Sequence, residues 1–172
     1  MSAGGNPCYL EGIDMPQKDY ILRVAEDVGR ALAQIISHKE IHDYQGALSL
    51  LDEFFKQSVG MGSGFIHAIS EETLLTMLTI VGVLDLEKAL LIAKLLKAEG
   101  DIYEEQGNAD EAYASYLKSL NLFLEILLRD DNLHDLRVSP EIEELLGRLE
   151  AYELPANTRR LLFQLYLCAF LK

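Results

Sequence analysis

Residues 93–126 read AKLLKAEGDIYEEQGNADEAYASYLKSLNLFLEI, and their small and aromatic residues are spaced as in a hairpin of two packed helices. Two antiparallel helices approach to roughly 8 Å only where the residues at their crossing are small. Gly100 and Ala112 are such residues, and they lie on either side of a turn at Gly107 and Asn108. Glycine suits the left-handed position that ends a helix, and asparagine suits the first position of the next one. The stretch therefore predicts an antiparallel helical hairpin.

The same stretch resembles one tetratricopeptide repeat, a unit of 34 residues. The residues that carry the resemblance are Leu96, Gly100, Tyr103, Gly107, Ala112, Tyr116 and Ser119. The resemblance implies stacked helical hairpins that bind extended peptides or protein segments in a groove lined by the first helix of each hairpin. The positions of this chain that match such a groove are Lys94, Lys97, Asp101 and Glu104.

The charges at these four positions leave two interpretations open. Lys94 and Lys97 suit an acidic peptide or a C-terminal carboxylate, but Asp101 and Glu104 stand where carboxylate-binding repeats carry neutral or basic groups. The alternative is an ordinary solvent-exposed face in which Lys97 pairs with Asp101, four residues later on the same helix.

Most of the chain also resembles a group of small bacterial proteins that carry no assigned activity. The shared phrases are DYILRxxExxGRALA, at residues 19–33, and KAEGDIYEEQGNADEAY, at residues 97–113. This resemblance supports the tetratricopeptide-like architecture and implies nothing further about function.

Length and charge restrict the class of protein. The chain has 172 residues, 49% of them hydrophobic, which suits one domain with a closed core. Its 28 acidic and 15 basic residues give a net charge of -13, which disfavours nucleic acid and anionic membranes as partners. No basic leader precedes an apolar stretch, and no segment of about 20 apolar residues occurs. We therefore expect a cytoplasmic protein that contacts no membrane.

Hydrophobic periodicity and capping residues predict an all-α fold, with a flexible arm at residues 1–16 and one domain at residues 17–172. Antiparallel helical hairpins would stack as a short tetratricopeptide-like array, with no strand. Residues 130–138 read as a linker. The seven expected helices cover residues 17–38, 44–58, 70–82, 86–106 and 109–129, and two more begin at Ser139 and Pro155.

The C-terminal helix is too apolar for a single buried face. Residues 161–171 contain only one strongly polar residue, Gln164. Such a helix requires either deep burial or an intermolecular contact. Because the ends of a helical array must be capped, we expect this helix to cap the stack or to form a homodimer interface.

Catalytic and metal-binding patterns are sparse. His38 and His42 are four residues apart, with Glu40 and Asp43 beside them, which is a spacing that can bind zinc. They lack the glutamate that directly follows the first histidine in the metalloprotease motif, and a histidine at a helix C-terminus also interacts favourably with the helix dipole. His67 reads as a solvated loop residue.

No phosphate-binding loop, nucleophile elbow or thiol-enzyme signature occurs. Residues 130–132 (Asp-Asp-Asn) lack the glycine and the distal glutamate of a calcium loop, and His134 reads as solvated. Cys8 and Cys168 suit reduced thiols. We therefore expect no cofactor and a non-catalytic scaffold for a protein or peptide partner. The alternatives are a small metal-dependent or acid–base enzyme with a site between helices, and a purely structural homodimer.

Overall fold

The computed structural model describes residues 29–30, 32–129 and 139–170 of the chain. These residues form eight helices and a two-stranded hairpin, so the fold is all-α, as predicted. The elements are a first helix over residues 29–30 and 32–40, α2 (Tyr44–Val59), α3 (Ser63–Ala68), α4 (Glu71–Met77), β1 (Thr79–Ile80), β2 (Val83–Leu84), α5 (Leu86–Glu105), α6 (Ala109–Arg129), α7 (Ser139–Arg148) and α8 (Ala156–Phe170). The predicted N-terminal arm and the 130–138 linker lie outside the described residues.

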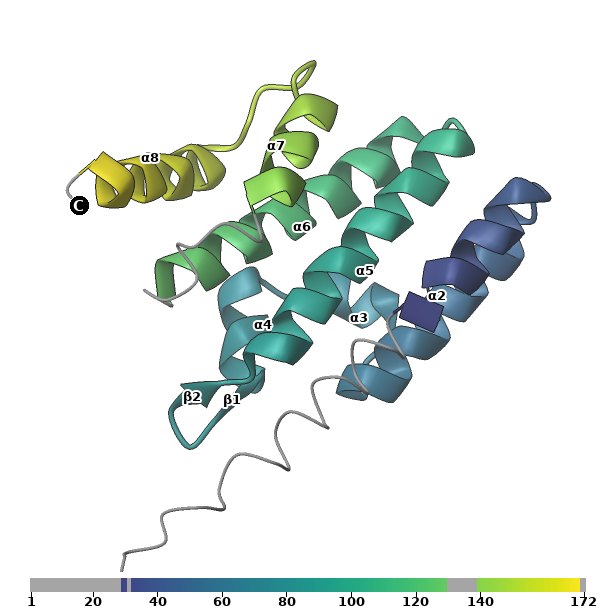
Figure 1. Cartoon of the computed structure of the whole chain (residues 1–172), viewed down its shortest axis with the longest axis horizontal. Helices are drawn as coiled ribbons and strands as arrows, with labels where there is room; N and C mark the ends of the chain where they lie inside the picture. Colours follow the sequence, from purple (N-terminus) through teal and green to yellow (C-terminus); the bar gives the residue numbers. More distant parts are fainter. Residues whose placement is uncertain (1–28, 31, 130–138, 171–172) are drawn as a thin grey trace, which may run out of the picture.

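Helices α5 and α6 form the predicted hairpin and share the most extensive contact between any two described elements (Figure 1). Gly107 ends α5 with a φ of 78°. The Gly107 amide donates to the Glu104 carbonyl, and the Asn108 amide donates to the Tyr103 carbonyl, both at 2.9 Å. This pair of bonds is the Schellman motif, which satisfies the last carbonyls of a helix. The Asn108 side chain, expected to cap α6, donates instead to Gln106 Oε1 at 3.1 Å.

The α5–α6 crossing depends on the small residues that the sequence singled out. A Cβ atom on Gly100 would lie 2.5 Å from Tyr116 Cε1, so the Tyr116 ring fills the space that the glycine leaves. Ala112 and Leu96 are buried in the same interface, and the Ser119 hydroxyl donates to the Ala93 carbonyl at 2.7 Å. The two helices therefore pack at the predicted positions.

The first helix and α2 are joined by a turn of the same kind. His42 takes the left-handed position, with a φ of 58°. The His42 amide donates to the Lys39 carbonyl, and the Asp43 amide donates to the His38 carbonyl. Asp43 then caps α2 by accepting a hydrogen bond from the Gly46 amide at 3.0 Å. Both hairpins thus end their first helix with the Schellman hydrogen-bond pattern.

Packing of the helices is sequential across the molecule. Helix α2 packs on α5, α5 on α6, and α6 on both α7 and α8, whereas α4 packs on α6 (Figure 1). The core lies between these helices, and its largest fully buried side chains include Phe55 of α2 and Phe123 of α6. This order places the first helix, α5 and α7 close enough to line one groove.

Two segments between α2 and α5 differ from the prediction. Residues 63–68, which include the expected loop residue His67, form helix α3. The helix expected to continue to Gly82 ends at Met77 and is followed by a hairpin in which Ile80 pairs with Val83. The expectation of no strand was wrong here because β-branched residues on both sides of a two-residue loop favour a hairpin.

Helix α8 leaves much of its apolar surface in solvent. Leu161 is buried, but Phe163, Tyr166 and Leu167 are 63%, 57% and 43% exposed. The structure therefore does not bury α8 deeply, which was one of the two expected alternatives. The other, a homodimer through α8, stays a prediction. None of the helices in the described part of the chain combines the length and the apolarity needed to span a bilayer.

Candidate functional site

A groove with a volume of about 260 Å³ lies between the first helix, α5 and α7. Its apolar side comes from the first helix, where Ile35 is buried and Ile36 is 54% exposed. The residues that line it are Leu32, Ile35, Ile36, Lys39, Lys94, Lys97, Ala98, Asp101 and Glu141. Three of the four positions expected from the sequence, Lys94, Lys97 and Asp101, are among these lining residues.

Lys94, Lys97 and Asp101 share one face of α5 because side chains three and four residues apart on a helix lie one above the other. The opposite face of α5 carries Leu96 and Gly100, which are buried against α6. Burial of that second face fixes the rotation of α5 and turns the charged face toward the first helix and α7.

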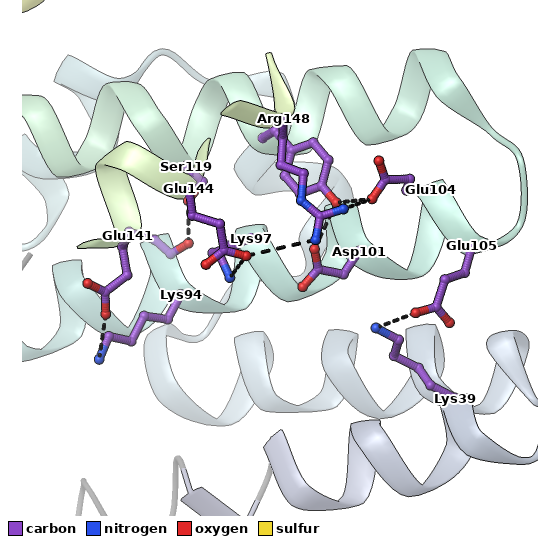
Figure 2. Close-up of polar contacts among 12 residues, drawn as sticks. Lys39, Lys94, Lys97, Asp101, Glu104, Glu105, Ser119, Glu141, Glu144 and Arg148 are labelled. Carbon is purple, nitrogen blue, oxygen red and sulfur yellow. Dashed lines mark hydrogen bonds and ion pairs between the residues drawn. The ribbon is translucent and has the colours of Figure 1, made fainter. Parts of the chain in front are cut away.

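Each groove lysine has an acidic neighbour on another element or at a helix end. Lys94 Nζ lies 3.8 Å from Glu141 Oε1 and Lys97 Nζ lies 2.9 Å from Glu144 Oε1, both carboxylates belonging to α7 (Figure 2). The pairing of Lys97 with Glu144 replaces the Lys97–Asp101 pair considered from the sequence. Lys39 Nζ, from the first helix, lies 2.8 Å from Glu105 Oε1 at the end of α5. Of the three lysines, Lys94 has the longest distance between its nitrogen and the paired carboxylate oxygen.

Glu104, the fourth expected groove residue, does not line the groove. Its carboxylate accepts hydrogen bonds from Arg148 of α7 and from the Tyr116 hydroxyl, the latter at 3.0 Å. Asp101 lies 2.7 Å from the same hydroxyl, so two carboxylates share one phenolic proton. Burial of the ring, together with these two carboxylates, raises the pKa of Tyr116 well above its usual value. The hydroxyl therefore stays protonated and acts as a hydrogen-bond donor.

Helix α7 supplies partners that sequence reasoning did not assign. Glu141, Glu144 and Arg148 are spaced three and four residues apart and lie on one face, while Ile142, Leu145 and Leu149 are buried. The spacing is visible in the sequence, but it does not indicate which element this face would meet.

A second polar cluster surrounds Glu99, which is only 2% exposed. His67 Nε2 of α3 lies 2.6 Å from Glu99 Oε2, and the Ser115 hydroxyl of α6 donates to the same oxygen at 3.2 Å. The Ser63 hydroxyl of α3 donates to Glu99 Oε1. The expectation that His67 is a solvated loop residue was wrong. A signal for Glu99 was present, because it follows Leu96 and precedes Ile102 at three-residue intervals on the apolar stripe of α5.

The geometry of this cluster favours a structural role over nucleophilic catalysis. A catalytic triad requires the base to contact the nucleophile and the acid to orient the base. Here Ser63 and His67 each bind the carboxylate of Glu99. The cluster therefore links α3, α5 and α6 around one buried carboxylate.

Asp52 of α2 holds the other side of α3. Its Oδ1 atom accepts a hydrogen bond from the Ser63 amide at 2.8 Å, and Lys56 donates to its Oδ2 atom. Two hydrogen bonds lower the pKa of Asp52. The bond from Lys56 has the larger effect, and the bond from the Ser63 amide has the smaller one. A carboxyl whose pKa is lower in the folded state stabilises the protein above its unfolded pKa, and loses this effect as pH falls through the folded value.

We expect the variant Asp52→Asn to have a lower Tm than the wild type at neutral pH. The difference should narrow as pH falls below about 4, the usual pKa of an aspartate, because the wild-type carboxylate then becomes protonated. Thermal unfolding of both chains across this range is the measurement. A Tm difference that stays constant with pH would contradict the assignment.

His38 and His42, the candidate zinc ligands in the sequence, make other contacts in the structure. His38 Nδ1 lies 2.8 Å from Asp43 Oδ2, and the His42 ring makes an edge contact with Tyr44 at a centroid distance of 5.9 Å. Among the described residues, no group of three or more His, Cys, Asp and Glu side chains is placed to hold a metal ion. Residues 130–132 and His134 lie outside the described ranges.

Comparisons with protein-family models, with curated proteins and with solved structures each gave no match to this chain.

Proposed function

We propose that the chain is a non-catalytic scaffold that binds a segment of another protein in the groove between the first helix, α5 and α7. The observation that carries the proposal is the groove itself, which combines the partly exposed Ile36 with Lys94 at its rim. Its volume of about 260 Å³ is below the 300–1,000 Å³ typical of sites for drug-sized ligands. A groove of this size suits one or two side chains of a peptide.

Charge supports a particular kind of segment. Lys39 and Lys97 have ion pairs of 2.8 and 2.9 Å, whereas the 3.8 Å pair and the 46% exposed side chain of Lys94 leave its ammonium group accessible. A partner carboxylate near Lys94 would meet this cation, while an apolar side chain of the partner covers Ile36. We therefore propose a peptide that carries an apolar residue next to an acidic group.

The test is selection from a random-peptide phage library on the wild-type protein, followed by titration of a selected synthetic peptide by fluorescence anisotropy. We expect Ile36→Asp to weaken binding at least tenfold, since loss of one buried aliphatic contact is worth about 1.5–3 kcal/mol. Lys94→Glu should weaken it about fivefold, the effect of removing an exposed ion pair of about 1 kcal/mol.

Two matched variants serve as controls. Ile41→Asp changes an isoleucine that is 71% exposed and does not line the groove, and Lys56→Glu reverses a charge on α2. Both should bind the peptide as the wild type does. Selected peptides that bind all four variants equally, or a library that yields no specific peptide, would contradict the proposal.

A further inference from the structure

The β1–β2 hairpin lies at one end of the molecule (Figure 1). Several of its apolar side chains are exposed. Ile80, Val81 and Val83 are 62%, 97% and 72% exposed, and Met77, just before β1, is also exposed. Isolated exposed apolar residues are common on protein surfaces, but a contiguous group on a projecting hairpin is typical of a contact surface.

The backbone at the tip is strained. Val81 and Gly82 have φ values of 51° and 80°, as in a type I′ turn. Such turns favour Asn-Gly or Asp-Gly, whereas a β-branched residue with positive φ is a conformational outlier. Because the Val81 side chain is almost fully exposed, packing against the described residues does not compensate for this strain. Strain of this kind concentrates at functional positions.

A hollow of about 230 Å³ lies directly beside the hairpin. Val59, Met61, Met77 and Leu78 supply its apolar lining, and Ile80 forms part of its wall. The volume holds several methyl groups, since a water molecule occupies about 30 Å³ of the liquid. An apolar projection thus lies next to a hollow that is lined by both apolar residues and the polar residues Ser58, Asp85 and Lys88.

We propose that this surface binds a second copy of the chain, with the Val81 tip of each copy inserted into the hollow of the other. A two-fold symmetric interface requires one patch that complements itself, and an adjacent projection and hollow meet that requirement. The proposal is independent of the groove and of α8.

Charge also favours a second copy at this position. Two chains with a net charge of -13 repel each other over most of their surfaces. The charged residues that line the hollow are Asp85 and Lys88, which form an ion pair at 3.2 Å, so the patch is locally neutral. Contact between two copies at the hairpin therefore brings no unpaired charge of the hollow into the interface.

The size of the patch predicts a weak dimer. A fully buried aliphatic side chain removes roughly 60–120 Å² from water, as follows from 1.5–3 kcal/mol at 25 cal/mol per Å². Four partly exposed side chains per copy therefore bury well under the roughly 800 Å² per partner of a standard stable interface. We expect dissociation in the high micromolar range, with dimers populated only at high protein concentration.

Sedimentation velocity from low micromolar to about millimolar concentration tests the proposal with the variant Val81→Asn. Asparagine suits the first loop position of the turn and removes the inserted apolar side chain. We expect dimerisation to weaken at least tenfold. In dilute, monomeric protein the same variant should relieve the backbone strain of the left-handed β-branched residue at position 81. In a chain of this size, that gain in stability should raise the Tm by about 2–4 °C. Association and monomer stability should thus change in opposite directions.

Two further variants make the test specific. Val83→Lys places like charges in the symmetric contact and should also abolish dimers, without changing the turn. Phe163→Lys alters the exposed apolar face of α8 and should leave the dimer that forms through the hairpin intact. A wild-type chain that stays monomeric up to millimolar concentration overturns the proposal, whatever else the hairpin binds. Dimers that Phe163→Lys dissociates and Val81→Asn does not would overturn it as well.

Discussion

Replacing Glu99 by alanine should lower the free energy of unfolding by about 3 kcal/mol, because it leaves one buried and two partly buried donors without their acceptor and opens a cavity in the core. Ser63, His67 and Ser115 all bind the Glu99 carboxylate, and Ser115 is 1% exposed. For a chain of this size the expected loss corresponds to a fall in Tm of about 6–12 °C. Chemical denaturation and calorimetry measure both quantities.

The loss should be concentrated in one region. Ser63 and His67 belong to α3, so hydrogen exchange should show the α3 amides losing most protection in Glu99→Ala. Glu53→Ala, on the exposed side of α2, provides the control and should change stability by less than about 0.5 kcal/mol. Glu99→Gln keeps the shape of the side chain and one acceptor oxygen, so its loss of stability should lie between those of Glu53→Ala and Glu99→Ala. Equal stability of Glu99→Ala and Glu53→Ala would show that the cluster contributes nothing.

Gly100→Ala should destabilise the protein by about 1–2 kcal/mol, although alanine is the better helix former by about 1 kcal/mol. The added Cβ would lie 2.5 Å from Tyr116 Cε1 and 2.6 Å from Cδ1. The ring is 3% exposed and its hydroxyl is held by Asp101 and Glu104, so it has little freedom to move away. Overpacking therefore outweighs the gain in helix propensity. Urea denaturation gives the difference.

A matched substitution should have the opposite sign. Gly147 lies in α7, and a Cβ there would meet no atom within 4 Å. Gly147→Ala should therefore stabilise the chain by about 0.5 kcal/mol. In a double-mutant cycle, Tyr116→Ala should cost less in the Gly100→Ala background than in the wild type, since the ring no longer clashes. Additive effects of the two substitutions would contradict the close contact.

Much of the helical structure follows from local sequence signals. The ends of α5 and α6 agree with the prediction because Asp85 caps α5 and the Gly107–Asn108 turn separates the two helices. The contact of Gly100 with α6 was also predicted, because close packing restricts the residue type at a crossing. The short elements between α2 and α5 were not predicted in full. Their periodic patterns span less than two helical turns, too few positions for a reliable hydrophobic period.

The candidate groove was predictable only in part. Lys94, Lys97 and Asp101 were placed on one face by helical spacing, and they line the groove with the first helix and Glu141. Glu104 carries the same charge as Asp101 and lies three residues later on α5, yet it binds Arg148 and does not line the groove. Sequence spacing does not distinguish these cases, since the partner of a charged side chain depends on which helix packs above it.

The sequence by itself determined the all-α class, the long hairpin and the face on which its charged residues lie, because caps, turns and helical periodicity act over a few residues. The tertiary structure alone decided which distant groups meet: His67 with Glu99, 32 residues apart, and the acidic face of α7 with the lysines of α5. It also placed the apolar hairpin tip in solvent. Such contacts depend on how whole helices are rotated and packed against one another, which the burial of their apolar faces settles only in the folded chain.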